Sequence, residues 1–187
     1  MIRLPRGIFL ILNILLYQAG WLACVLAAAH GSPVLGVLVA AALLALHLAL
    51  SPAPQRDVLL AAIFVGVGLL VDSSLALSGW LVFQSPGPVA ALTPPWLLAI
   101  WGLFAITLHA SLGWLQGRSL LAALLGGPAG ALAYWAGNRL GAIEFPLGLV
   151  ETLAVLALVW AAVLPCLAWI ARRTAHGFPR PGQEATP

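Results

Sequence analysis

The sequence predicts an all-α membrane protein, a bundle of six transmembrane helices with both termini in the cytoplasm. The chain is 63% hydrophobic, and its eight basic and five acidic residues fall almost entirely between long apolar runs. A helix of about 20 apolar residues crosses the ~30 Å hydrocarbon core of a bilayer. Six runs in the chain are long enough to do so.

Breaks with turn chemistry place these helices in order. The His-Gly-Ser-Pro sequence at 30–33 separates the first two runs, and Ser-Pro-Ala-Pro at 51–54 ends the second. The Ser-Pro-Gly-Pro sequence at 85–88 follows the third, and Gln-Gly-Arg at 116–118 separates the fourth from the fifth. The predicted spans are 8–29, 33–51, 58–83, 94–116, 119–137 and 148–171, forming one transmembrane domain over 1–173, with a disordered cytoplasmic tail over 174–187.

The arginines predict the orientation. Only Arg139 falls on the far side of a six-span chain, and the other seven fall on the side of the termini. Basic residues concentrate in cytoplasmic loops, so this side is predicted to be cytoplasmic. The net charge of +3 is explained by this topology, and no nucleic-acid partner is predicted. The seven arginines are Arg3, Arg6, Arg56, Arg118, Arg172, Arg173 and Arg180.

Small residues predict close helix packing. Ala19, Ala23 and Ala27 form a four-spaced ridge on the first helix. We interpret the ridge as a packing face, and the alternative is a docking face for a partner membrane subunit. The Gly-Gly-Pro-Ala-Gly sequence at 126–130 predicts a kink or partial unwinding of the fifth helix.

Two histidines are predicted to lie at equal depth toward the cytoplasmic side. His47 is 14 residues into the second predicted span and His109 is 15 residues into the fourth. Such a pair could bind a b-type haem, although two histidines bonded to neighbours such as Asn13 or Ser111 are the favoured interpretation. No metal-binding spacing occurs, and no cofactor is predicted.

Asp72 is the sole acidic residue well inside a predicted span. Because a lone carboxylate in hydrocarbon needs a cation or a proton, we expect Arg139 to reach toward it. The favoured interpretation is that the pair pins two helices together, and the alternative is that it forms the floor of an outward-facing polar cavity with Glu144 and Glu151 near its rim. The candidate ligand-binding residues are Asn13, Gln18, Asp72, Tyr134, Asn138, Arg139 and Glu151.

Several motifs together resemble an uncharacterised family of bacterial inner-membrane proteins, classed as a domain of unknown function. They include Gln-Ala-Gly-Trp at 18–21, Gly-Leu-Leu-Val-Asp-Ser at 68–73, Ser-Leu-Gly-Trp at 111–114 and Tyr-Trp-Ala-Gly at 134–137. The resemblance covers residues 8–170. The resemblance implies a location in the bacterial inner membrane. Genes of this family often lie beside genes for cyclopropane-synthase-like lipid methyltransferases and photolyase-type proteins, which implies, by association, a part in membrane-lipid modification or stress response.

The sequence contains no recognised catalytic motif and leaves open whether the protein is an enzyme. The favoured hypothesis is an accessory component in membrane-lipid modification or lipophile handling, with a membrane lipid as its partner. One alternative is a substrate-binding subunit or small transporter, since size and topology resemble the substrate-capture subunits of energy-coupling-factor transporters. The other is a b-type haem protein.

Overall fold

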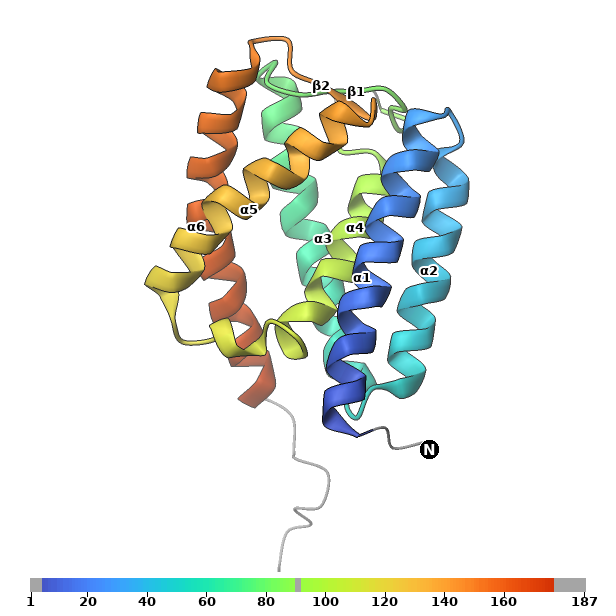
Figure 1. Cartoon of the computed structure of the whole chain (residues 1–187), viewed down its shortest axis with the longest axis vertical. Coiled ribbons are helices and arrows are strands. Elements are labelled where there is room, and N and C mark those ends of the chain that lie inside the picture. Colours follow the sequence, from blue (N-terminus) through green and yellow to red (C-terminus); the bar gives the residue numbers. More distant parts are fainter. Residues whose placement is uncertain (1–4, 90–91, 177–187) are drawn as a thin grey trace, which may run out of the picture.

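The computed structural model describes residues 5–89 and 92–176, and over these residues the chain forms six α-helices (Figure 1). The helices run alternately up and down, so α1 begins and α6 ends at the same end of the bundle (Figure 1). The predicted all-α fold is thereby confirmed. The elements are α1 (Arg6–Ala29), α2 (Pro33–Leu50), α3 (Pro54–Leu77), β1 (Val82–Phe83), α4 (Pro95–His109), the 3-10 turn η1 (Gly113–Leu115), α5 (Ser119–Arg139), β2 (Ile143–Glu144) and α6 (Leu149–His176).

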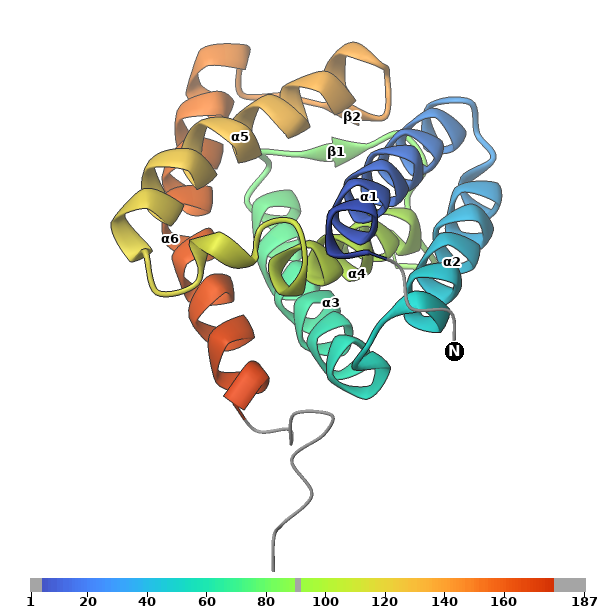
Figure 2. The same ribbon diagram turned by 60° about the horizontal axis from the view of Figure 1, so that its bottom comes forward.

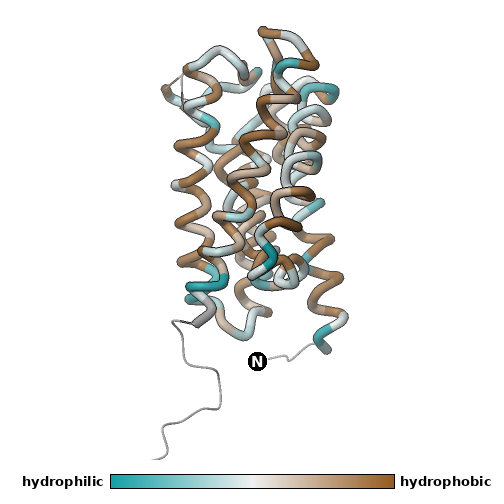
Figure 3. Tube along the Cα trace, turned by 90° about the vertical axis from the view of Figure 1, so that its left-hand side faces the viewer, coloured by the Kyte–Doolittle hydropathy of each residue, from teal (hydrophilic) through white to brown (hydrophobic). Residues whose placement is uncertain are grey.

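Five helices (α1, α2, α3, α5 and α6) are long and apolar enough to cross a membrane. Hydrophobic residues follow the helices along their length (Figure 3). Large apolar side chains such as Leu38, Leu70 and Leu158 point outward and are mostly exposed, as expected for surfaces that face lipid. The chain is therefore a multi-pass membrane protein. Arg3, Arg180 and the predicted tail from 177 onward lie outside the described residues, whereas 174–176 belong to α6.

Helix α4 is the shortest helix and the most enclosed. It packs against α1, α2 and α3, and ten of its 15 residues are buried. It ends at His109 rather than at the predicted residue 116, because the backbone N–H of Ser111 donates to Asn13 Oδ1 (3.3 Å) instead of continuing the helix. The side-chain amide of Gln116 then donates through Nε2 to the carbonyl oxygen of Leu108 (2.6 Å), which gives this acceptor at the helix end a partner.

Helix α3 begins and ends earlier than the predicted span 58–83. Pro54 occupies its first turn, where the missing N–H costs nothing, and the helix ends at Leu77 before Gly79 turns the chain with φ +77°. As a consequence Arg56 and Asp57 belong to the first turn of α3 rather than to a loop. Asp57 is buried there, facing α2 and α4.

Glycines bring α5 and α6 into close contact. A Cβ on Gly126 would lie 2.7 Å from the carbonyl oxygen of Trp160, and one on Gly127 would lie 2.9 Å from that of Ala157. A Cβ on Gly130 would overlap the indole ring of Trp160. Helix α5 stays continuous through Pro128, so the predicted unwinding does not occur, and the glycines provide helix packing instead.

The alanine ridge of α1 has a packing partner within the chain. A Cβ on Gly36 of α2 would lie 2.7 Å from Cys24 Cα and 3.2 Å from Ala27 Cβ. It would also lie 3.3 Å from the carbonyl oxygen of Ala23. Ala23 and Ala27 thus pack toward α2, whereas Ala19 is exposed.

A two-stranded antiparallel ladder closes the end of the bundle opposite the termini (Figure 2). Val82 pairs with Glu144 and Phe83 with Ile143, which joins the loop after α3 to the loop after α5. The side chain of Gln84 donates to Glu144 Oε1 (2.6 Å) beside this ladder. The ladder therefore ties the α5–α6 hairpin to the rest of the bundle at this end.

Candidate functional site

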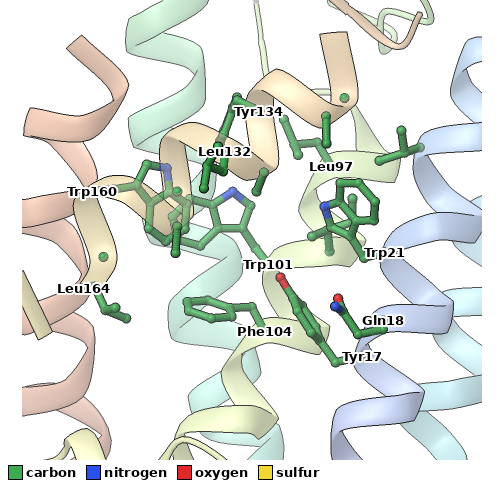
Figure 4. Close-up of a pocket in the computed structure, with 18 of the residues that line it drawn as sticks. Tyr17, Gln18, Trp21, Leu97, Trp101, Phe104, Leu132, Tyr134, Trp160 and Leu164 are labelled. Carbon is green, nitrogen blue, oxygen red and sulfur yellow. The ribbon is translucent and has the colours of Figure 1, made fainter. Parts of the chain in front are cut away.

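A cavity of about 650 Å³ lies between α1 and α4 on one side and the α5–α6 hairpin on the other (Figure 4). We call it the aromatic cavity. Aspartate, glutamate, arginine and histidine are all absent from the described residues that line it. Its aromatic lining consists of Tyr17, Trp21, Trp96, Trp101, Phe104, Trp114, Tyr134 and Trp160.

The aromatic cavity opens between α1 and α5. Lining residues on both of these helices are exposed: Gln18 and Leu22 on α1, and Leu125, Ala129 and Leu132 on α5. Four of these five side chains are aliphatic. Because exposed aliphatic surface on membrane-spanning helices faces lipid, the opening leads sideways into the bilayer rather than to water.

Packing holds the aromatic rings of the cavity wall in place. Trp101 of α4 stacks on Trp160 of α6 with ring centroids 5.1 Å apart and an interplanar angle of 16°. Phe104 meets the same indole edge-on at 5.8 Å. Gly68 and Gly130 make room for this stack, because a Cβ on either glycine would overlap the indole of Trp101 or Trp160 respectively. The wall is therefore preformed.

Asp72 lies behind this wall and links three helices. It is fully buried, and its two carboxyl oxygens accept hydrogen bonds from Trp101 Nε1 (2.7 Å) and from the hydroxyl of Tyr134. The predicted Asp72–Arg139 pair is wrong: Arg139 is exposed at the end of α5 and forms no ion pair with any described residue. Neutral donors on α4 and α5 meet the carboxyl group instead.

Three polar groups of the cavity lining lack hydrogen-bond partners among the described residues. Tyr17 and Gln18 extend from α1 toward Trp101 (Figure 4), and no hydrogen bond to their side chains is found within the described chain. The indole N–H of Trp160 is buried and also has no partner there. A buried donor without a partner is costly, so the indole N–H of Trp160 would gain from a ligand that offers a neutral acceptor. The half-buried Tyr17 and the exposed Gln18 offer further polar groups to the same ligand.

A second polar site, the histidine–aspartate cluster, consists of Asn13, His47, Ser51, Asp57 and His109. Asp57 accepts hydrogen bonds from Ser51 Oγ (2.5 Å), His47 Nε2 (3.3 Å) and His109 Nδ1 (2.8 Å). The amide nitrogen of Asn13 lies 3.5 Å from His47 Nδ1. The same amide nitrogen lies 3.4 Å from the carbonyl oxygen of Ile106, so Asn13 also joins the cluster to α4.

His109 lies between two acceptors. Its Nδ1 faces Asp57, and its Nε2 lies 3.1 Å from the carbonyl oxygen of Ala171 on α6. The hydroxyl of Thr174 also lies 3.2 Å from Nε2, so both ring nitrogens of His109 have hydrogen-bond partners. The cluster thus ties the starts of α1 and α3 to the ends of α2, α4 and α6.

The predicted haem pair does not fit this arrangement. His47 and His109 are brought together, as the equal depths indicated, but the Asp57 carboxylate lies between them. All four ring nitrogens already have hydrogen-bond partners, so neither ring presents a free nitrogen to an iron atom. The described residues also contain no group of three or more His, Cys, Asp or Glu side chains suited to a metal ion.

The other predicted site residues are dispersed. Gln18 and Tyr134 line the aromatic cavity, whereas Asn13 belongs to the histidine–aspartate cluster. Asn138 donates to the carbonyl oxygen of Ile143 (2.9 Å) and so supports the turn before β2. Glu151 is exposed in the first turn of α6. The predicted outward-facing polar cavity is thus not assembled from these residues.

Sequence reasoning missed three residues that shape these sites: Asp57, Trp101 and Trp160. Asp57 falls in the loop between the predicted spans 33–51 and 58–83. Pro54 is a signal for an earlier helix start, and a helix that starts there places Asp57 in its first turn. The two tryptophans carried no sequence signal, because their stacking depends on glycines of other helices.

The fold and the cavity define a multi-pass, all-helical membrane protein with an intramembrane hollow that opens toward lipid. The chain belongs to the family described as Protein of unknown function (DUF2878), whose model matches residues 10–166. Membership in an uncharacterised family, expected from the sequence motifs, is thereby confirmed. No curated protein and no solved structure matches the chain.

Proposed function

We propose that this protein binds a lipophilic molecule in the aromatic cavity and acts in the handling or modification of membrane lipid. The observation that carries the proposal is a preformed hollow of about 650 Å³ with an aromatic wall and an aliphatic opening between α1 and α5. Pockets of ~300–1,000 Å³ with mostly apolar linings are typical small-molecule sites. A hollow with a lateral opening admits a molecule directly from the bilayer.

The lining restricts the chemistry of the part that enters. Charged groups pay a large desolvation cost in an apolar site that offers no counter-charge. Tyr17, Gln18 and Trp160 offer only neutral hydrogen-bonding groups. The cavity therefore suits hydrocarbon chains or rings that carry at most a neutral hydroxyl or carbonyl, and any charge on the ligand must remain outside it.

The proposal includes the location in the bacterial inner membrane and the orientation. Arg6, Arg56, Arg118 and Arg172 lie in or beside elements at the terminal end of the bundle, whereas Arg139 lies at the opposite end. This distribution supports a cytoplasmic location for the terminal end. A reporter that is active only in the periplasm can be fused to the C-terminus. Activity of this fusion would contradict the cytoplasmic location of the terminal end.

Native mass spectrometry of the gently solubilised protein tests lipophile binding. Wild type should carry a stoichiometric lipid-sized adduct. Ala133→Trp, on the cavity face of α5, should lose the adduct because the indole fills the space. Ala154→Trp, on an exposed position of α6 that does not line the cavity, is the matched control and should keep it.

Two results would count against lipophile binding in this cavity. One is a bare wild-type protein in both mild detergent and nanodiscs. The other is an adduct that Ala133→Trp retains at the wild-type level. Co-purification of membrane-coupling subunits would favour the transport alternative for the same cavity, and because Ala23 and Ala27 pack toward α2, only Ala19 of the predicted docking face is left exposed for such a subunit.

A further inference from the structure

A second hollow, the arginine pocket, lies at the terminal end of the bundle and has a volume of about 420 Å³. Helices α1 and α3 supply Arg6 and Arg56 from their first turns. The end of α4 and the turn after it supply His109, Ser111 and Gln116. The lining thus gathers two guanidinium groups and several neutral hydrogen-bonding groups from segments far apart in the chain.

The charges of the arginine pocket favour an anion. The carboxylate beside it, Asp57, is already bonded to Ser51, His47 and His109. Arg56 Nε lies 3.9 Å from Asp57 Oδ1, beyond hydrogen-bond distance, and this buried N–H has no partner among the described residues. The single carboxylate of Asp57, which lies within ion-pair distance of Arg56, offsets at most one of the two guanidinium charges. The pocket therefore keeps a net positive charge with donors to spare.

The arginine pocket and the aromatic cavity adjoin each other. The segment 110–116 lies between them, and Trp114 lines both hollows. Trp114 is 48% exposed, so the residue that the two hollows share is accessible. A tryptophan in this position is typical of the boundary between the hydrocarbon and the polar headgroup region.

We infer that the ligand is a phosphate-bearing lipid whose phosphate binds between Arg6 and Arg56 and whose chain enters the aromatic cavity past Trp114. The inference rests on the proposed function for the chain-binding half. A phosphate matches the pocket because its several oxygens accept from two guanidinium groups and from hydroxyl or amide donors at once. It also answers the requirement that the charge of the ligand stay outside the aromatic cavity.

The test compares three probes on the purified full-length protein by native mass spectrometry. Dioleoyl phosphatidic acid carries both chain and phosphate, dioleoylglycerol carries the same chains without phosphate, and inorganic phosphate serves as a competitor. Wild type should bind phosphatidic acid about tenfold or more tightly than dioleoylglycerol, since charge-assisted hydrogen bonds are each worth at least a factor of this order. Inorganic phosphate should compete weakly, because it lacks the chain.

Arginine variants assign the preference to the pocket. Arg56→Gln and Arg6→Gln should each reduce phosphatidic acid binding toward the level of dioleoylglycerol, and Arg56→Lys should restore part of it. Arg139→Gln, at the opposite end of the bundle, is the matched control and should leave the preference unchanged. Arg6 is exposed, so its variant tests the pocket even where Arg56→Gln fails to fold.

The outcomes separate this inference from the proposed function. Equal binding of the two lipids, with both lost in Ala133→Trp, overturns the phosphate assignment and leaves lipophile binding intact. A second outcome is phosphate-dependent binding that Ala133→Trp does not weaken and that inorganic phosphate displaces fully. This outcome assigns the arginine pocket to free phosphate and overturns the assignment of a lipid ligand. A preference that persists in both Arg6→Gln and Arg56→Gln also overturns the inference.

Discussion

The hydroxyl of Tyr134 provides the sharpest test of how the aromatic cavity is held together. It donates to Asp72, and with Trp101 it connects α5 to α3 and α4 across the wall of the cavity. Helix α5 otherwise packs almost entirely on α6. Replacing Tyr134 by Phe removes only the donor and keeps the ring, so the change isolates one hydrogen bond.

The magnitude follows from burial. Asp72 is fully buried, so Tyr134→Phe leaves one carboxyl oxygen without a donor, at a cost of about 1–3 kcal/mol. For a chain of 187 residues each kcal/mol corresponds to about 2–4 °C of unfolding midpoint, so the midpoint should fall by about 2–12 °C.

Thermal unfolding in detergent, followed by tryptophan fluorescence, measures this shift. Tyr17→Phe is the matched control: Tyr17 lines the same cavity, but its hydroxyl bonds to no described residue, so its midpoint should stay within about 2 °C of wild type. Equal midpoints for Tyr134→Phe and wild type, or an equal fall in both variants, would refute the role of this hydrogen bond.

Three further experiments, with five substitutions in all, test the packing and the second site. Gly130→Ala should destabilise the protein by about 1–3 kcal/mol, because its Cβ would overlap Trp160. Gly66→Ala has open space around the Cβ and should be neutral or stabilising. Similar thermal unfolding midpoints for the two variants would contradict the role of Gly130 in packing. Asp57→Asn should cost about 1.5–3 kcal/mol, because it replaces a buried carboxylate that accepts from Ser51, His47 and His109, and Ser51→Ala only about 1 kcal/mol, because it removes one of these donors. A larger loss for Ser51→Ala than for Asp57→Asn would contradict the central place of Asp57 in the cluster. Asn13→Ala should accelerate amide hydrogen exchange over residues 110–116, because Ser111 loses its acceptor; exchange that rises elsewhere but not there would argue against Asn13 as the group that ends α4.

Hydropathy predicted the helices because lipid exposure leaves a strong one-dimensional signal. Apolar runs that are bounded by Pro33, Pro54 or the turn at Gly117 predicted the ends of α1, α2 and α5 to within a few residues of the observed ends. The same signal failed at the end of α4. Residues 110–116 are apolar enough to continue a helix, and only the distant side chain of Asn13 diverts the chain there.

The candidate site could be predicted only in part, because depth along a helix is readable from sequence and direction around it is not. Equal depth brought His47 and His109 together correctly. Arg139 was expected to reach toward Asp72 because a lone carboxylate needs a cation, yet the facing positions on α4 and α5 hold Trp101 and Tyr134. Choosing between these partners requires the rotation of each helix, which is set by glycine contacts between helices far apart in the chain.

The enclosure of α4 implies that two helices of similar hydropathy obey different rules of substitution. In α2 only 17% of the most apolar window is buried, so exchanging one aliphatic residue for another alters mainly contacts with fluid lipid. In α4 side chains such as Leu103, Ile106 and Leu108 are enclosed on all sides, and there a change of even one methylene alters the fit. A saturation scan of the whole chain should therefore find the exposed positions of α2 permissive to any aliphatic residue and α4 selective for size and shape, as in the core of a water-soluble protein.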